Sequence, residues 1–135
     1  MALSRAIEVN EAWRTVRDPI KRAEAILALE GLEGEIGETR EPKPTGEFLM
    51  EVLESRERLD EAKGAKDAGR VAAIVAEAKA QLGAVERALG ETIDTAIAAR
   101  DLNALRAAIP LLGRLRYAAR FASEAIAADD RLSGF

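Results

Sequence analysis

The longest regular pattern in the sequence is a set of apolar residues that recurs every three or four positions. Its members are Val71, Ile74, Val75, Ala78, Leu82, Val85, Leu89, Ile93 and Ile97. This spacing places them on one side of a helix of about seven turns. No alternating polar and apolar run of any length occurs elsewhere. The pattern therefore predicts an all-α protein, with other helices packed along this apolar stripe.

Two helices are expected in the first thirty residues. Residues 3–17 carry apolar side chains at helical spacing. Asp18 is a good N-cap and Pro19 a good first helical residue, so a second helix is expected to begin there. It should span residues 19–29 and end at Gly31, which suits a helix C-terminus.

Residues 31–46 have a different composition, with four Gly, two Pro and many Glu. This composition is typical of a linker or an ordered loop. Because so long a connection is unusual inside a compact bundle, we expect it to mark a boundary between subdomains.

The remaining helices are expected on either side of the long one. A third helix should span residues 45–63, with a break near residues 64–69. After the long helix, Asp101 provides a new N-cap for a last helix over residues 102–128. Pro110 lies inside that last helix, where it should bend the helix or leave a carbonyl group unpaired. The chain thus predicts a helical pair followed by an antiparallel three-helix bundle.

The helix over residues 45–63 carries more apolar surface than one core stripe needs. An ordinary stripe consists of Phe48, Val52, Leu59 and Ala62. A second face contains Leu49, Met50, Leu53 and Glu57, with Glu54 and Glu61 beside them. An apolar patch with an acidic rim is typical of a docking surface.

Tyr117 is the unusual residue of the last helix. It lies about 140° from the mean direction of the apolar side chains of that helix, so it should be exposed unless Pro110 changes its direction. One interpretation is a Tyr packed over an Arg-rich surface with its hydroxyl in water. The other is an aromatic anchor at an interface, where exposed Tyr is favoured.

Charge is unevenly distributed along the chain. The net charge is −4, which argues against general binding to nucleic acid or to an anionic membrane. Residues 30–61 hold eleven acidic residues against four basic ones, a local charge of −7. Residues 100–120 hold five Arg against one Asp, a local charge of +4. The simplest interpretation is that these two segments pair across the bundle.

The sequence contains no Cys and no His. Disulfides and the usual thiolate and imidazole ligands of transition metals and iron–sulfur clusters are therefore excluded. No nucleophile–base set, phosphate-binding glycine pattern or metal-ligand cluster is present either, so we expect neither enzymatic activity nor a cofactor. The chain has no apolar run of eighteen residues and no signal-peptide pattern, and a cytoplasmic location is expected.

Three segments resemble one family. Residues 48–62 resemble the opening helix of the C-terminal domain of the HscB family, J-type co-chaperones of iron–sulfur cluster assembly. Residues 10–24 are similar to the closing helices of a J-domain as that family writes them. Arg114-Leu115-Arg116-Tyr117 and the helix after it form the third match. The matches follow the family's order and spacing and together span nearly the whole chain.

The resemblance implies a domain plan and two partners. Residues 1–30 would be the remnant of the J-domain's closing helices, 31–46 a linker or loop, and 47–135 a scaffold-binding three-helix bundle. The family's scaffold-binding face, which takes the scaffold protein IscU, matches Leu49, Met50, Leu53, Glu54, Glu57 and Tyr117. A dedicated DnaK-type chaperone would be the second partner. The alternative is a structural helical module without a chaperone role, which oligomerises through its N-terminal helices, for example as a homodimer, or through the Leu49 and Leu53 face.

The sequence departs from the family at one motif. A J-domain needs His-Pro-Asp before its third helix to engage the chaperone's ATPase, and this chain has no His. It begins inside what would be that third helix. The surface formed by Trp13, Val16 and Ile26 would ordinarily pack against the missing helices, so we expect it to be exposed, covered by a partner or folded differently.

Overall fold

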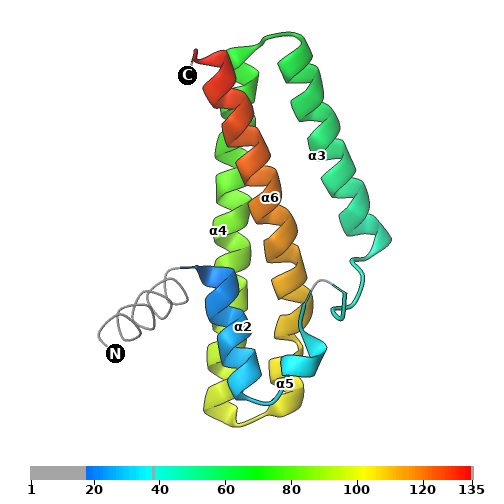
Figure 1. Ribbon diagram of the computed structural model, residues 1–135, viewed down its shortest axis with the longest axis vertical. Helices are drawn as coiled ribbons and strands as arrows, with labels where there is room; N and C mark the ends of the chain where they lie inside the picture. The colour runs from blue at the N-terminus through cyan, green and yellow to red at the C-terminus, as the bar shows by residue number, and fades with distance from the viewer. Residues whose placement is uncertain (1–17, 38, 135) are drawn as a thin grey trace, which may run out of the picture.

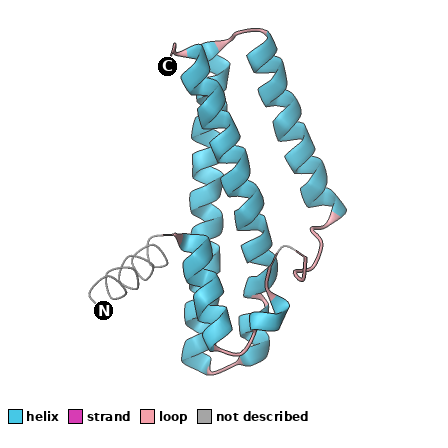
Figure 2. Ribbon diagram, in the orientation of Figure 1, coloured by secondary structure: helices cyan, strands magenta, loops and turns pink. Residues whose placement is uncertain are grey.

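Figure 1 shows a computed structural model, which describes residues 18–37 and 39–134. The helix expected over residues 3–17, with Trp13 and Val16, lies outside them. Within the described part, the elements are α2 (Pro19–Leu29), the short 3₁₀ helix η1 (Glu33–Glu35), α3 (Gly46–Gly64), α4 (Ala68–Ala99), α5 (Leu102–Arg106) and α6 (Ala108–Leu132). These ranges contain no strand (Figure 2), so the all-α prediction is confirmed.

The long helices α4 and α6 form the axis of the molecule. They run antiparallel and side by side along its length, while α2 packs near one end and α3 near the other (Figure 1). Helices α3, α4 and α6 therefore form the expected antiparallel bundle, and α2 covers the half of the α4–α6 pair that α3 leaves open.

The core is divided in the same way. A lower core cluster joins α2 and the following loop to α4, α5 and α6: Ala23, Leu27, Leu32, Ile36, Leu89, Ile93, Ala96, Leu105, Ala108, Ile109, Leu112 and Leu115. An upper core cluster joins α3 to the other halves of α4 and α6: Leu59, Ala62, Val71, Ile74, Val75, Ala78, Phe121, Ala122, Ala125 and Ala128. Leu82 packs against both clusters.

Helix α2 has the bounds that its capping residues predicted. The Asp18 carboxylate accepts hydrogen bonds from the backbone N–H groups of Ile20 and Lys21, at 2.9 and 3.3 Å. At the other end Gly31 adopts φ +89°, and the N–H of Leu32 donates to the Leu27 carbonyl at 2.9 Å. This is a Schellman ending, which needs a residue with positive φ and turns the next apolar side chain toward the helix. Leu32 is accordingly buried in the lower core cluster.

The described part of the connection over residues 31–46 is an ordered loop. Leu32 and Ile36 contribute to the lower core cluster, and the Glu41 carboxylate accepts a hydrogen bond from the Gly37 N–H at 2.6 Å. Helix α2 shares that cluster with α4, α5 and α6. The division into residues 1–30, 31–46 and 47–135 stays a prediction.

Pro110 separates two helices instead of bending one. Helix α5 ends at Arg106 and α6 begins at Ala108, so Pro110 is the third residue of α6, where no helical N–H bond is required. In one continuous helix its ring would clash with the Arg106 carbonyl, four residues earlier. The expected start at Leu102 with Asp101 as N-cap is confirmed, but the single helix over residues 102–128 was wrong, since the chain turns at Ala107 and α6 continues to Leu132.

An ion-pair cluster links α2, the loop and α6. The Arg116 guanidinium donates to both carboxylate oxygens of Glu41, at 3.2 and 3.0 Å, and lies 3.5 Å from the Glu24 carboxylate. The hydrogen bond to Glu41 is the largest cause of a raised Arg116 pKa. Arg106 pairs with Glu35 at 3.2 Å. Charge pairing between the acidic segment 30–61 and the basic segment 100–120 is thus confirmed.

Candidate functional site

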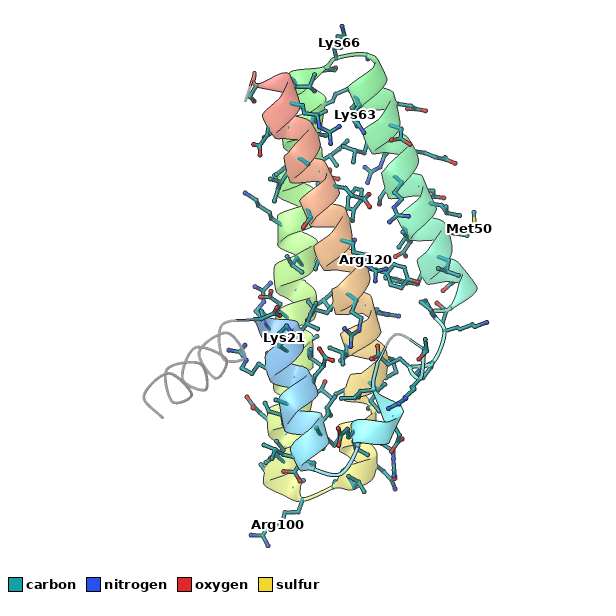
Figure 3. The ribbon with its side chains drawn as sticks, in the orientation of Figure 1. Lys21, Met50, Lys63, Lys66, Arg100 and Arg120 are labelled. Atoms are coloured by element: carbon teal, nitrogen blue, oxygen red, sulfur yellow. The ribbon has the colours of Figure 1, made fainter. Side chains whose placement is uncertain are left out.

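The second apolar face of α3 is open to solvent. Leu49 is 40% exposed, Met50 57% and Leu53 53%. Figure 3 shows Met50 pointing away from the bundle on the outer side of α3. Of the core stripe of this helix, Leu59 and Ala62 are buried, whereas Phe48 and Val52 are only half-buried.

Ion pairs show which flank of α3 faces which helix. Arg56 pairs with Glu124 of α6 at 3.2 Å, and Arg58 pairs with Glu77 of α4 at 3.4 Å. Leu49 and Leu53 precede Arg56 by seven and three positions, which are the spacings of one helix flank. The two leucines therefore lie on the flank that faces α6.

The acidic residues lie farther round the same helix. Glu54 precedes Arg58 by four positions and so shares the α4 flank, where Glu61 also pairs with Arg70 at 3.8 Å. Glu57 follows Met50 by seven positions and lies on the outer side with it. We call the exposed carboxylates Glu51, Glu54, Glu57 and Glu61 the acidic edge. They line a shallow hollow beside Gln81 of α4.

Tyr117 lies against α3 instead of standing free in solvent. It is half-buried, and its ring meets the Phe48 ring edge to face, with centroids 5.7 Å apart and planes at 79°. It points away from Leu112, as expected, but Phe121, four residues further on, is buried on the side of α6 that carries Tyr117, and α3 packs there. The exposure expected for Tyr117 was therefore too high, because the pattern of one helix does not show which other helix covers it.

Two arginines flank this aromatic pair. The Arg114 guanidinium carbon lies 5.4 Å from the centre of the Phe48 ring, and that of Arg120 lies 6.0 Å from the centre of the Tyr117 ring. Both distances allow a cation–π attraction. The sequence-based site did not include Phe48, Arg114 or Arg120. The three-residue spacing of Arg114, Tyr117 and Arg120 is the signal that could have shown the arginines.

The first half of α3 is loosely seated on the bundle. None of its residues from 46 to 58 is fully buried. A hollow of about 150 Å³ lies beneath it, lined by Phe48, Glu51, Val52, Ser55, Gln81, Val85, Arg114, Tyr117, Ala118 and Phe121. The Phe48–Tyr117 contact therefore holds the part of α3 that carries Leu49, Met50 and Leu53.

Among residues 18–37 and 39–134, no group of three or more Asp, Glu, His or Cys side chains is placed to hold a metal ion. None of the helices described is long and apolar enough to cross a membrane.

Known proteins resemble this chain over most of its length. Residues 45–125 match the family model described as the HSCB C-terminal oligomerisation domain. A co-chaperone protein HscB homolog of Shewanella amazonensis is 33% identical over 132 residues, which cover 98% of this chain and 73% of that protein. The homolog of Burkholderia multivorans is also 33% identical over 132 residues, covering 98% and 70%. That of Burkholderia mallei is 36% identical over 95 residues, covering 70% and 53%.

Proposed function

Because this chain belongs to the HscB family of co-chaperones, we propose that it binds an IscU-type iron–sulfur scaffold protein and presents it to a dedicated DnaK-type chaperone. The binding face would consist of Leu49, Met50, Leu53, Glu54, Glu57 and Tyr117. A cytoplasmic location belongs to the same proposal. The observation that carries it is the exposed apolar set on one side of α3, beside the half-buried Tyr117.

The size of this apolar set suits a protein interface. Fully burying a Leu or Met side chain contributes about 1.5–3 kcal/mol. Leu49, Met50 and Leu53 each have roughly half of that contribution still available, since they are 40%, 57% and 53% exposed. Together they would add about 2–4 kcal/mol on docking. An apolar centre with a polar rim around it is the usual anatomy of a protein interface.

The test is calorimetric titration of the IscU-type scaffold encoded in the same genome. The variant Leu49→Ala/Leu53→Ala should stay helical, since Ala favours a helix at least as well as Leu. Its binding free energy should weaken by about 1.5–3 kcal/mol, the share of the two leucines in the sum above. Ile97→Ala/Leu102→Ala is the matched control, because these side chains are 42% and 43% exposed at the other end of the molecule. If the Leu49→Ala/Leu53→Ala variant binds the scaffold as tightly as the parent chain does, the assignment of this face of α3 to scaffold binding is wrong.

The second candidate is a structural module that forms a homodimer. The description of the matching family model, which names oligomerisation, favours it. The contact would use the N-terminal helices or the Leu49 and Leu53 face. Sedimentation over a hundredfold range of concentration distinguishes the two functions. A dimer that dissociates on dilution and ignores the scaffold would support the module, and a monomer that binds the scaffold would exclude it.

We do not expect this chain by itself to make the contact that stimulates the chaperone's ATPase. The resemblance assigns that contact to a His-Pro-Asp motif, and the sequence has no His. We therefore separate the two steps. Scaffold binding belongs to α3 and α6 of this chain, and ATPase stimulation is not expected from it by itself.

A further inference from the structure

The exposed apolar face of α3 has opposite charges on its two sides. Toward α4 lies the acidic edge, in which Glu54 follows Met50 by one helical turn and Glu57 follows it by two. Toward the loop and α6 lie two exposed basic residues, Lys43 and Arg120, which we call the basic edge.

The basic edge borders the same face through Tyr117. Lys43 and Arg120 line a hollow of about 230 Å³ together with Glu41, Pro42, Pro44, Gly113, Arg116 and Tyr117. Within this hollow the Arg116 charge is already paired with Glu41. The Arg120 guanidinium lies over the Tyr117 ring, and Figure 3 shows Arg120 between α6 and α3. The positive charge of this edge is thus placed beside the aromatic member of the candidate site.

The order of groups across the surface follows from these contacts. Leu49 and Leu53 lie on the α6 flank of α3, so they face the side that carries Tyr117 and Arg120. Met50 and Glu57 lie on the outer side, and Glu54 lies toward α4. From α6 to α4 the surface is therefore basic, then apolar, then acidic.

We infer that this face takes a charge-polarised partner surface in one orientation. The partner surface has an apolar centre. It carries basic groups opposite Glu54 and Glu57, and an acidic group opposite Lys43 and Arg120. The inference rests on the proposed function and adds Lys43 and Arg120 as residues that determine specificity. A partner turned by half a rotation would place like charges together on both edges, which disfavours the wrong docking geometry.

A simpler alternative makes the opposite prediction for the basic edge. The chain has a net charge of −4, so a uniformly basic partner would be attracted to it as a whole. Lys43 and Arg120 would then oppose binding, and their removal would strengthen it. The polarised face requires instead that both edges favour binding.

The experiment measures association rates and dissociation constants for the full chain and the IscU-type scaffold of the same genome, at 50 and 300 mM salt. An acidic-edge variant, Glu54→Gln/Glu57→Gln, is compared with a basic-edge variant, Lys43→Gln/Arg120→Gln. Lys66→Gln/Arg131→Gln is the control, because it removes the same charge near the α3–α4 turn and the end of α6. Lys43→Gln alone, a change in a loop, tests the basic edge without disturbing the Tyr117 ring contact.

Each edge variant should weaken binding about two- to fivefold per removed charge at 50 mM salt. Most of the loss should be in the association rate, and it should shrink at 300 mM salt because surface charges are screened. Basic-edge variants that bind as tightly as the control or more tightly would overturn the inference, as would an unchanged acidic-edge variant. If the scaffold binds the parent chain and one of these variant results is obtained, the inference is wrong but the proposed function is unaffected. A scaffold that does not bind the parent chain at all removes both.

Discussion

The ion pair between Glu41 and Arg116 provides a direct test of how α2 and the loop are held on the bundle. Only 5% of the Glu41 side chain is exposed, and 15% of that of Arg116. Replacing Glu41 with Gln keeps the shape but removes the negative charge that faces Arg116. The Glu24 carboxylate, 3.5 Å from Arg116, would then be the negative charge that remains beside it in this cluster.

The expected loss is larger than for a surface ion pair. Hydrogen bonds to charged groups contribute about 1.5–3 kcal/mol each, and breaking one side of a buried pair costs about 3–5 kcal/mol. Glu24 compensates in part, and Gln can still accept one hydrogen bond. We therefore expect Glu41→Gln to lower the free energy of unfolding by about 2–4 kcal/mol. For a chain of this size that corresponds to a fall in Tm of roughly 10 °C.

The assay is urea unfolding followed by circular dichroism, together with thermal melting. Glu35→Gln is the matched control, because Glu35 pairs with Arg106 at 3.2 Å but both side chains are about half exposed (46% and 45%). The free energy of unfolding of that variant should fall by less than about 1 kcal/mol. If Glu41→Gln is no more destabilising than Glu35→Gln, the argument from burial is wrong.

Three further results are expected. A steady-state ATPase assay of a DnaK-type chaperone should show no stimulation by this 135-residue chain alone, and strong stimulation would contradict the role given to the missing His. Tyr117→Ala should increase hydrogen exchange over residues 46–56 while Tyr117→Phe should not, because only the ring contacts Phe48; equal protection in both variants would refute that contact. Pro110→Ala should change the free energy of unfolding by less than about 1 kcal/mol, since the first turn of a helix needs no N–H there, and a loss of 3 kcal/mol would show that Pro110 has another role.

Local signals in the sequence predicted helix ends well where the cap lies within the segment itself. Asp18, Pro19 and Gly31 define α2 through contacts a few residues apart, so its bounds could be predicted. Pro110 was harder to interpret because its effect depends on whether the chain before it continues as a helix. A turn at Ala107 relieves the clash, and the single expected helix becomes two.

Residues whose environment depends on tertiary packing were predicted less well. Ile97 was expected to continue the apolar stripe of α4, but it is 42% exposed, and the residue buried at this end of the helix is its neighbour Ala96. Tyr117 was expected to point away from the apolar side chains of its own helix, but Phe121, four residues further on, is buried on the same side, and the contact of Tyr117 with Phe48 depends on how α3 crosses α6. The open face formed by Leu49, Met50 and Leu53 was identifiable, because one helix carried more apolar surface than its core stripe needed.

Helix α3 is packed firmly on the bundle near its C-terminal end and less firmly near its N-terminal end, so it can tilt about the firmly packed end. Leu59 and Ala62 anchor the helix in the upper core cluster, and Leu49 lies about 15 Å from Leu59 along the axis. A tilt of about 10° at that anchor would move Leu49 by roughly 2.5 Å. The hollow beneath the first half of the helix gives this movement room. We therefore expect the proposed docking face to follow partners of slightly different shape, while the lower core cluster, which contains no residue of α3, keeps its packing.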